Sequence, residues 1–163
     1  MNRRRIVITV VAALTLALDL GTKLWAQAKL RGQDPLVLLP RYLQLEYHEN
    51  AGMAFGLGRN LPGARAVLIG TGVLVLFLVW RVVRQVQRRR GLADVAFALV
   101  VGGAVGNIVD RLRQGRVVDF VVMHWQQRYV WPAYNVADVA LCVGVGLLLL
   151  TMGAQPAGSG DRR

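Results

Sequence analysis

Two aspartates lie in apolar stretches of the chain, where burying an acid is costly. Asp119 lies inside RVVDFVVMHW, and Asp138, 19 positions later, lies at the start of the apolar segment in YNVADVALCVGVGLLLL. Two carboxylates held close together cannot both ionise easily, so they share a proton. The ionised acid can take a proton from water, and the protonated acid can donate to a carbonyl oxygen and then to a leaving amine. The pair therefore has the chemistry needed to hydrolyse a peptide bond.

The chain offers few other reactive groups. Its only serine is Ser159, near the C-terminus, and its only cysteine is Cys142. We expect Cys142 to lie one turn deeper in the membrane than Asp138, as a buried and inert thiol. A zinc site remains an alternative, although the spacing of its four candidate ligands matches no metal signature: Glu46, His48, Glu49 and His124.

Other polar residues lie in or beside the apolar runs. Each ionisable group inside a membrane costs about 2.5–3.5 kcal/mol unless it is paired or functional. Asp19 and Lys23 lie one helical turn apart and can form a structural ion pair. Asp110 or Asp119 could pair with Arg111 in the same way. No nearby cation is placed to pair with both Asp119 and Asp138, so a functional role is favoured for these two acids. Three groups could hold the substrate or its developing oxyanion: Asn107, Arg111 and Asn135.

Four apolar runs must position these residues, at about residues 6–25, 66–86, 92–109 and 133–152. Each is close to the roughly 20 residues that cross a bilayer as a helix. Apolar residues surround these helices rather than forming one stripe, which disfavours the alternative of a soluble bundle. The sequence predicts a mainly α, polytopic membrane protein with four transmembrane helices. Residues 1–153 would form one domain, and residues 154–163 a flexible cytoplasmic tail.

The charge distribution predicts the orientation. The net charge is +11, and ten of the 20 basic residues flank the apolar runs on one side of the four-span arrangement. The positive-inside rule places that side, with both termini, in the cytoplasm. RVVRQVQRRR could instead be a nucleic-acid patch. The N-terminal run could also be a signal peptide cleaved after Ala26-Gln27-Ala28, but it is long for one and carries Asp19 and Lys23.

The two outward connections, at about residues 26–65 and 110–132, should carry the site. Alternation around Leu43, Leu45 and Tyr47 predicts short strands in a small extracytoplasmic β-rich platform. The glycines of ENAGMAFGLGRN predict turns that bring the backbone close to a ligand. Two further groups have structural interpretations. Four aromatic residues suit a position among the lipid head groups, namely Trp125, Tyr129, Trp131 and Tyr134. Three glycines allow close helix packing, namely Gly102, Gly103 and Gly106.

Five blocks of the sequence resemble one known family. They are LDLGTK (18–23), NAGMAFG (50–56), GGAVGNIVDR (102–111), GRVVDF (115–120) and YNVAD (134–138). Together they are similar to the lipoprotein signal peptidases, also called signal peptidase II, in their order and from the first span to the last. Tyr134 is a mild departure, because phenylalanine is the most frequent residue there.

The resemblance implies an aspartic endopeptidase of the bacterial inner membrane, with its active site at the outer face. Relatives remove the signal peptide of prolipoproteins, cutting just before a cysteine that carries diacylglyceryl. It further implies an enzyme that uses no metal or cofactor, contacts membrane lipid and is inhibited by cyclic peptides of the globomycin type. Nothing in the sequence requires more than a monomer. The implied residues are the catalytic pair Asp119 and Asp138; the substrate-site residues Asn50, Gly52, Asn107, Arg111 and Asn135; and the supporting residues Asp19, Lys23 and Asp110. NAGMAFG is expected to clamp the bound peptide.

Two other classes of function remain open. A small transporter or channel subunit would use intramembrane acids as an ion path, but it needs polar residues through the full membrane depth. Here they gather at one face, and the second and third spans are nearly bare of them. A scaffold or insertion factor would account for the packing glycines but not for five polar motifs.

Overall fold

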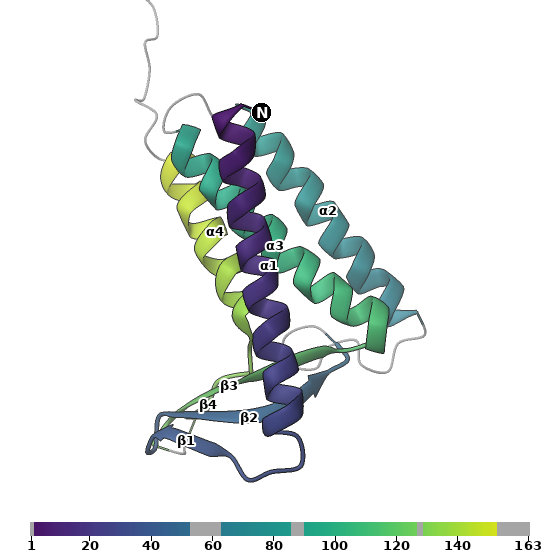
Figure 1. Ribbon diagram of the computed structural model, residues 1–163, viewed down its shortest axis with the longest axis vertical. Helices are drawn as coiled ribbons and strands as arrows, with labels where there is room; N and C mark the ends of the chain where they lie inside the picture. Colours follow the sequence, from purple (N-terminus) through teal and green to yellow (C-terminus); the bar gives the residue numbers. More distant parts are fainter. Residues whose placement is uncertain (1, 53–62, 86–89, 127–128, 153–163) are drawn as a thin grey trace, which may run out of the picture.

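The computed structural model describes residues 2–52, 63–85, 90–126 and 129–152. Within these residues, four helices form a bundle and a small sheet lies across one end of it (Figure 1). The helices are α1 (Arg3–Lys29), α2 (Ala64–Gln85), α3 (Arg90–Gln114) and α4 (Val136–Met152). The antiparallel sheet has the order β1-β2-β3-β4, with strands β1 (Leu36–Leu39), β2 (Leu43–Asn50), β3 (Val117–Trp125) and β4 (Tyr129–Val130). The mainly helical fold and the small platform are both confirmed.

Three of the four described helices, α1, α2 and α3, have the length and hydropathy of membrane spans. The stretches Arg3–Lys29, Arg65–Gln85 and Gly91–Gln114 have mean hydropathies of 1.8, 2.4 and 1.9 and are long enough to cross a bilayer. Helix α4 is apolar but has 17 residues, which corresponds to about 25 Å. Large apolar residues face outward, such as Leu14 with 64% and Leu149 with 62% of the residue surface exposed. Such faces are costly in water and suit contact with lipid.

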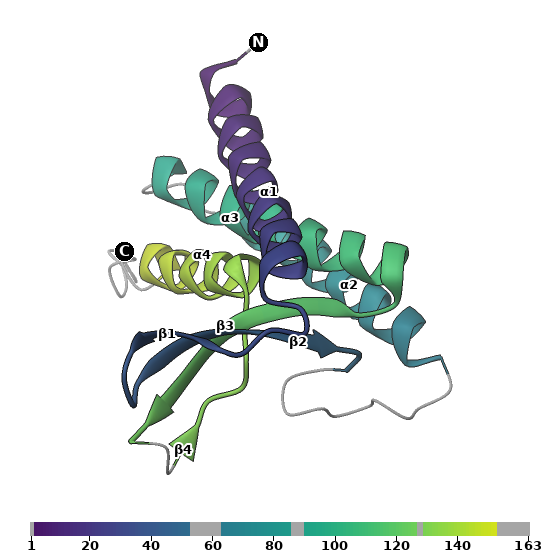
Figure 2. The ribbon, with the colours of Figure 1, turned by 60° about the horizontal axis from the view of Figure 1, so that its bottom comes forward.

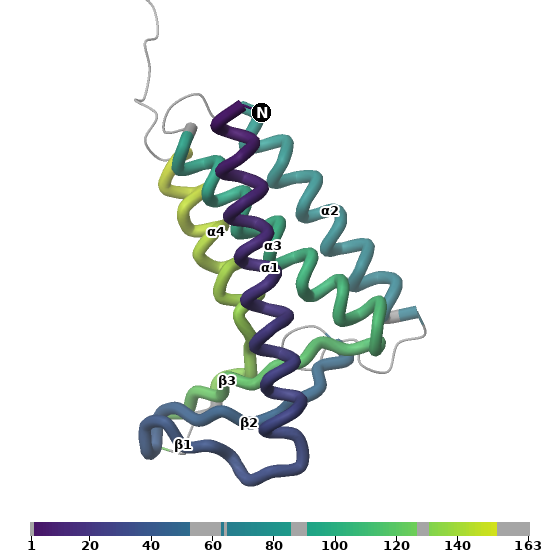
Figure 3. The backbone as a smooth tube through the Cα atoms, viewed as in Figure 1, coloured from purple at the N-terminus to yellow at the C-terminus, as the bar shows by residue number. Residues whose placement is uncertain are grey.

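Helix α3 contacts all three of the other helices, and Figure 3 shows it crossing behind α1. Two adjacent glycines allow this close packing. A Cβ atom at Gly102 would lie 2.6 Å from Thr15 Cβ on α1, and one at Gly103 would lie 2.6 Å from the Ala137 carbonyl oxygen on α4. The predicted packing role of the glycines is confirmed, and they serve two faces of α3 rather than one.

The end of the bundle far from the sheet is held by an ion pair that the sequence did not indicate. Arg4 Nε donates to both carboxylate oxygens of Asp94, at 2.8 and 2.9 Å, and so joins the start of α1 to the start of α3. Helix α1 runs unbroken through Ala26-Gln27-Ala28 to Lys29, and Ala26 is fully buried. The first apolar run is therefore an integral part of the folded body.

At the other end, the tip of α1 packs against the sheet, as Figure 2 shows. Ala26 and Leu30 form an apolar cluster with Val118 and Phe120 of β3. Successive side chains on a strand point to opposite faces, so Asp119 points away from this cluster. The strands predicted around Leu43, Leu45 and Tyr47 are confirmed as β2, whereas the nine-residue strand β3 around Asp119 was not predicted.

The boundaries of two spans differ from the prediction. Helix α3 continues past residue 109 to Gln114. Helix α4 begins at Val136 rather than residue 133, because the backbone just before it belongs to the sheet. Tyr134 N–H donates to the Val121 carbonyl at 3.1 Å, and Val121 N–H donates back at 2.9 Å. The tail at 154–163 and residues 53–56 of the predicted clamp lie outside the described residues.

Candidate active site

Asp119 is positioned by the pairing of β2 with β3. His48 lies opposite Asp119 and Asn50 lies opposite Val117, so Asn50 is a diagonal neighbour of Asp119 on the same face of the sheet. Asn50 Nδ2 donates to Asp119 Oδ2 at 3.0 Å. Asn50 Oδ1 accepts from the Gly52 N–H at 3.0 Å, which fixes which end of this amide faces the acid. Residues 50–52, the part of the motif NAGMAFG that the structure describes, therefore contact Asp119 directly through Asn50.

Asp138 is positioned by the first turn of α4. The side chain of Asn135, the residue before the helix, accepts from the Asp138 N–H at 3.0 Å. The Asp138 carboxylate accepts in return from the Asn135 N–H at 3.2 Å. This reciprocal arrangement is a capping box, which satisfies backbone donors that the first turn leaves without partners. The positive end of the helix dipole also stabilises negative charge at this position.

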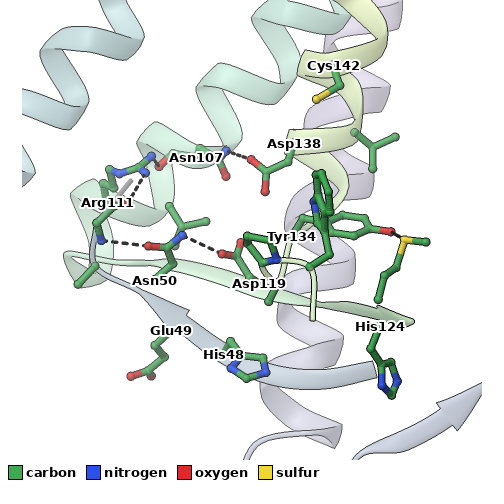
Figure 4. Close-up of a pocket in the computed structure, with 18 of the residues that line it drawn as sticks. His48, Glu49, Asn50, Asn107, Arg111, Asp119, His124, Tyr134, Asp138 and Cys142 are labelled. Carbon is green, nitrogen blue, oxygen red and sulfur yellow. Dashed lines mark hydrogen bonds between the residues drawn. The ribbon is translucent and has the colours of Figure 1, made fainter. Parts of the chain in front are cut away.

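Asn135 connects Asp119 and Asp138, the two acids labelled in Figure 4. While its oxygen caps α4, its Nδ2 donates to Asp119 Oδ1 at 2.6 Å. The same nitrogen lies 3.2 Å from the Val118 carbonyl oxygen. Asn135 is fully buried and does not line the pocket described below. It therefore holds both carboxylates from behind, whereas the sequence placed it in contact with the substrate.

A buried polar cluster lies behind the acids. Lys23 Nζ lies 2.8 Å from Asp19 Oδ2 and 3.0 Å from Asp110 Oδ2, and it donates to Asn107 Oδ1 at 2.9 Å. Asp19 Oδ1 accepts from the Ala137 N–H, and Asp110 Oδ2 accepts from the Val118 N–H. The predicted Asp19–Lys23 pair is confirmed. Asp110 pairs with Lys23 rather than with Arg111.

Two other groups lie close to the acids. Asn107 Nδ2 donates to Asp138 Oδ1 at 2.9 Å. Arg111, one helical turn further along α3, is part-buried, and its charge acts on Asp138, Asp119 and Asp110. Its Nη2 lies 3.5 Å from the Gly52 carbonyl oxygen and its Nη1 lies 3.4 Å from the Asn107 carbonyl oxygen, and both contacts are long. The structure thus brings together all ten residues named from the sequence.

The surroundings of Asp119 favour its protonated form. Its pKa is raised from the ordinary 3.8 to about 6. Burial is the largest cause, because it penalises the charged carboxylate, and the negative charge of Asp138 adds to the effect. Hydrogen bonds from Asn50 and Asn135 oppose this rise without cancelling it.

The two acids lie in a pocket of about 1080 Å³ with a polar floor and apolar walls. Asp119, Asp138, Asn107 and Arg111 belong to the floor. The walls come from α4 and from the β3–β4 region, namely Val139, Cys142 and Val143, and Met123, Trp125, Trp131 and Tyr134. Such a mixture suits a ligand that is mostly apolar and has a polar group at the acids.

One prediction changes at these walls. Cys142 is exposed and lines the pocket, so the expectation of a buried thiol is wrong. Trp125 and Trp131, interpreted from the sequence as head-group residues, also line the pocket. Within the described ranges, no group of three or more His, Cys, Asp or Glu residues is arranged to hold a metal ion, the four candidates for zinc included.

Comparison with known proteins gives the family. The model of a family described as signal peptidase (SPase) II matches residues 11–154. The chain belongs to the signal peptidase II family. It is 43% identical to the lipoprotein signal peptidase of Syntrophotalea carbinolica over 88% of this chain and 89% of the relative. It is 38% identical to that of Symbiobacterium thermophilum over 86% of this chain and 90% of the relative.

Comparison with solved structures agrees with this family. A solved structure of a bacterial membrane enzyme superposes with a TM-score of 0.76 at 26% identity, covering 96% of this chain and 93% of that one. A second such structure, at 24% identity, gives the same TM-score. As a signal peptidase II, the chain is a membrane-embedded enzyme of an aspartic peptidase family. This membership disfavours the transporter and scaffold alternatives.

Proposed function

We propose that this signal peptidase II removes the signal peptide from diacylglyceryl-modified prolipoproteins, cutting just before the lipidated cysteine. One observation carries the assignment of its catalytic groups. A single buried residue, Asn135, donates from its side chain to Asp119 Oδ1 and from its backbone N–H to Asp138 Oδ2, behind the floor of one pocket. The pocket lies where the helices meet the sheet, the level at which a membrane-anchored signal peptide ends.

The charges around the floor favour one shared proton. Four carboxylates gather there, Asp19, Asp110, Asp119 and Asp138, against two cations, Lys23 and Arg111. A proton on one acid reduces this excess of negative charge. Asp119 is the better site, because its pKa is raised to about 6, while Asp138 lies at a helix N-terminus that stabilises charge.

The reaction follows from this asymmetry. Ionised Asp138 takes one proton from a water molecule, and the water oxygen attacks the carbonyl carbon of the scissile bond. Asp119 donates its proton to the carbonyl oxygen as the tetrahedral intermediate forms. When the C–N bond breaks, the departing nitrogen takes the proton that Asp138 holds, and the hydroxyl that becomes the carbonyl oxygen returns its proton to Asp119. The products are a free carboxyl on the signal peptide and a free amine on the lipidated cysteine.

The remaining polar groups hold the substrate. Arg111, Asn50 and the backbone at Gly52 lie at one end of the pocket, where they can bind carbonyl oxygens of the extended peptide. Asn107 reaches both the pocket and Asp138. Asn135, Asp19, Lys23 and Asp110 support these groups from the protein side. Apolar residues Val139, Cys142 and Val143 give the acyl chains a surface that continues along α4 into the membrane.

The arrangement of the helices fits an inner-membrane enzyme with both termini in the cytoplasm. Arg3, Arg4 and Arg5 lie at the start of α1, far from the sheet (Figure 1). Arg84 lies at the end of α2 and Arg90 at the start of α3, on the same side. The positive-inside rule then places the sheet and the pocket at the outer face. Residues 1–153 act as one monomeric domain followed by a cytoplasmic tail, and globomycin-type cyclic peptides would inhibit by occupying the pocket.

Dependence on the lipid tests this function. Purified protein is expected to cut a diacylglyceryl-modified prolipoprotein at its cysteine and to cut the unmodified precursor at least ~100-fold less efficiently, because burying only four methylene groups contributes about 3 kcal/mol. Mass spectrometry of the products gives the cleavage site, and initial rates give kcat/KM. Equal cleavage of both precursors, or cleavage away from the cysteine, would contradict the proposal.

A further inference from the structure

Lys23 is buried beside the dyad but does not line the pocket. An ammonium group has three N–H donors and no acceptor. Its three partners are Asp19 Oδ2, Asp110 Oδ2 and Asn107 Oδ1, at 2.8, 3.0 and 2.9 Å. Of these three contacts, only the one with Asn107 is to a residue that contacts a proposed catalytic acid.

That contact determines which end of the Asn107 amide faces Asp138. Asn107 Oδ1 accepts from Lys23 Nζ and lies 3.3 Å from Asn135 Nδ2, which is also a donor. An NH2 group in this place would meet two donors, so the oxygen must occupy it. The Asn107 NH2 group is then directed at Asp138 Oδ1, at 2.9 Å.

We propose that Lys23 is a positioning residue for the dyad, which locks the Asn107 amide with its NH2 group toward Asp138 and so keeps Asp138 as the ionised base. The inference rests on the proposed function and adds to it the residue that keeps Asp138 as the base. Each of the two acids accepts two N–H donors, but Asp138 also lies at the N-terminus of α4 and is less buried than Asp119, so the shared proton remains on Asp119. Lys23 itself touches neither acid of the dyad in this arrangement; it acts through Asn107.

The rival explanation is that Lys23 acts by its charge alone. Charged or titratable groups surround Asp138 from every neighbouring element: Asp19 and Lys23 on α1, His48 and Glu49 on β2, Asp110 and Arg111 on α3, Asp119 and His124 on β3, Tyr134 before α4 and Cys142 on it. Removing one cation from this set would alter the pH dependence even if the amide never turned. The test must therefore separate the orientation of the amide from the charge.

A double-mutant cycle on the pH dependence of kcat/KM makes this separation, with the diacylglyceryl-modified prolipoprotein as substrate. The variants are Lys23→Met, Asn107→Ala and the double variant. Asn107→Ala removes the amide donor from Asp138, so the acid limb of the profile should move up by about one pH unit, the size expected for a hydrogen bond to a charged group. Lys23→Met removes the shorter of the two donors that orient the amide and leaves only Asn135, so the acid limb should move in the same direction by part of that amount. The double variant should show the shift of Asn107→Ala alone. Additive shifts would show that Lys23 acts independently of Asn107, and would overturn the proposal.

Lys23→Gln is the matched control, because it is also neutral but keeps an N–H donor that can reach Asn107 Oδ1. Its acid limb should stay within about 0.3 pH unit of wild type. A shift as large as that of Lys23→Met would assign the effect to charge and reject the amide lock. Because Lys23→Gln keeps two N–H donors, one for Asn107 Oδ1 and one for Asp19 or Asp110, the comparison with wild type decides the question even if Lys23→Met does not fold. Failure of the wild-type protein to cleave would instead count against the proposed function.

Discussion

Replacing either Asp119 or Asp138 with asparagine is expected to reduce kcat/KM for the modified prolipoprotein by at least about 10³-fold, since general acid or general base catalysis contributes roughly 10²–10⁴ each. An amide has nearly the shape of the carboxyl group, so the pocket and the capping box should persist. Asp119→Asn removes the acid that gives its proton to the carbonyl oxygen. Asp138→Asn removes the base that takes a proton from water. Initial cleavage rates of the purified variants in detergent or bilayers measure the effect.

Asp94→Asn is the matched control for these two variants. It makes the same chemical change in a buried acid, but Asp94 pairs with Arg4 at the far end of the bundle. Its activity should stay within about twofold of wild type, because changes distant from the site leave the barrier unaltered. If Asp119→Asn or Asp138→Asn also retained wild-type activity, the two acids could not be the catalytic pair.

Asn135→Ala is expected to lower kcat/KM by about 10²-fold and stability by about 2 kcal/mol, the sum of a lost helix cap and an unpaired buried group. The activity falls because Asp119 loses its 2.6 Å donor and Asp138 loses the reciprocal cap. Thermal unfolding in detergent and initial cleavage rates report the two effects separately.

Asn135→Ser separates the two roles of this side chain. A serine hydroxyl can cap α4 but cannot also reach Asp119 as the amide does. Most of the lost stability should return with Asn135→Ser, while kcat/KM should remain low. If serine restored both, the bond from Asn135 to Asp119 would have no part in catalysis.

The spans and the identity of the acids were predictable from the sequence because they depend on local features. Runs of about 20 apolar residues report helices directly, and an acid within such a run is costly enough to indicate pairing or function. The spacing of Asp19 and Lys23 likewise fixes their contact within one helix. These predictions need no knowledge of how distant segments meet.

Predictions that depended on distant segments were less complete. The strand around Asp119 is buried over most of its length, so VVDFVV shows no alternation that would separate it from a span. Cys142 was assigned to a buried position because hydropathy does not show which side of α4 faces the pocket. The dual contact of Asn135 depends on β3 lying beside the first turn of α4, and no spacing in the sequence reports that approach.

The most direct test of the central claim, that Asp119 holds the proton while Asp138 is ionised, is the pH dependence of kcat/KM. Below about pH 6 Asp119 is protonated, so activity should fall about tenfold per pH unit as the pH rises well above its pKa. At low pH activity should fall again as Asp138 takes up a proton, which gives a bell-shaped profile. A profile that stays flat from about pH 4 to about pH 8 would contradict this division of the two acids.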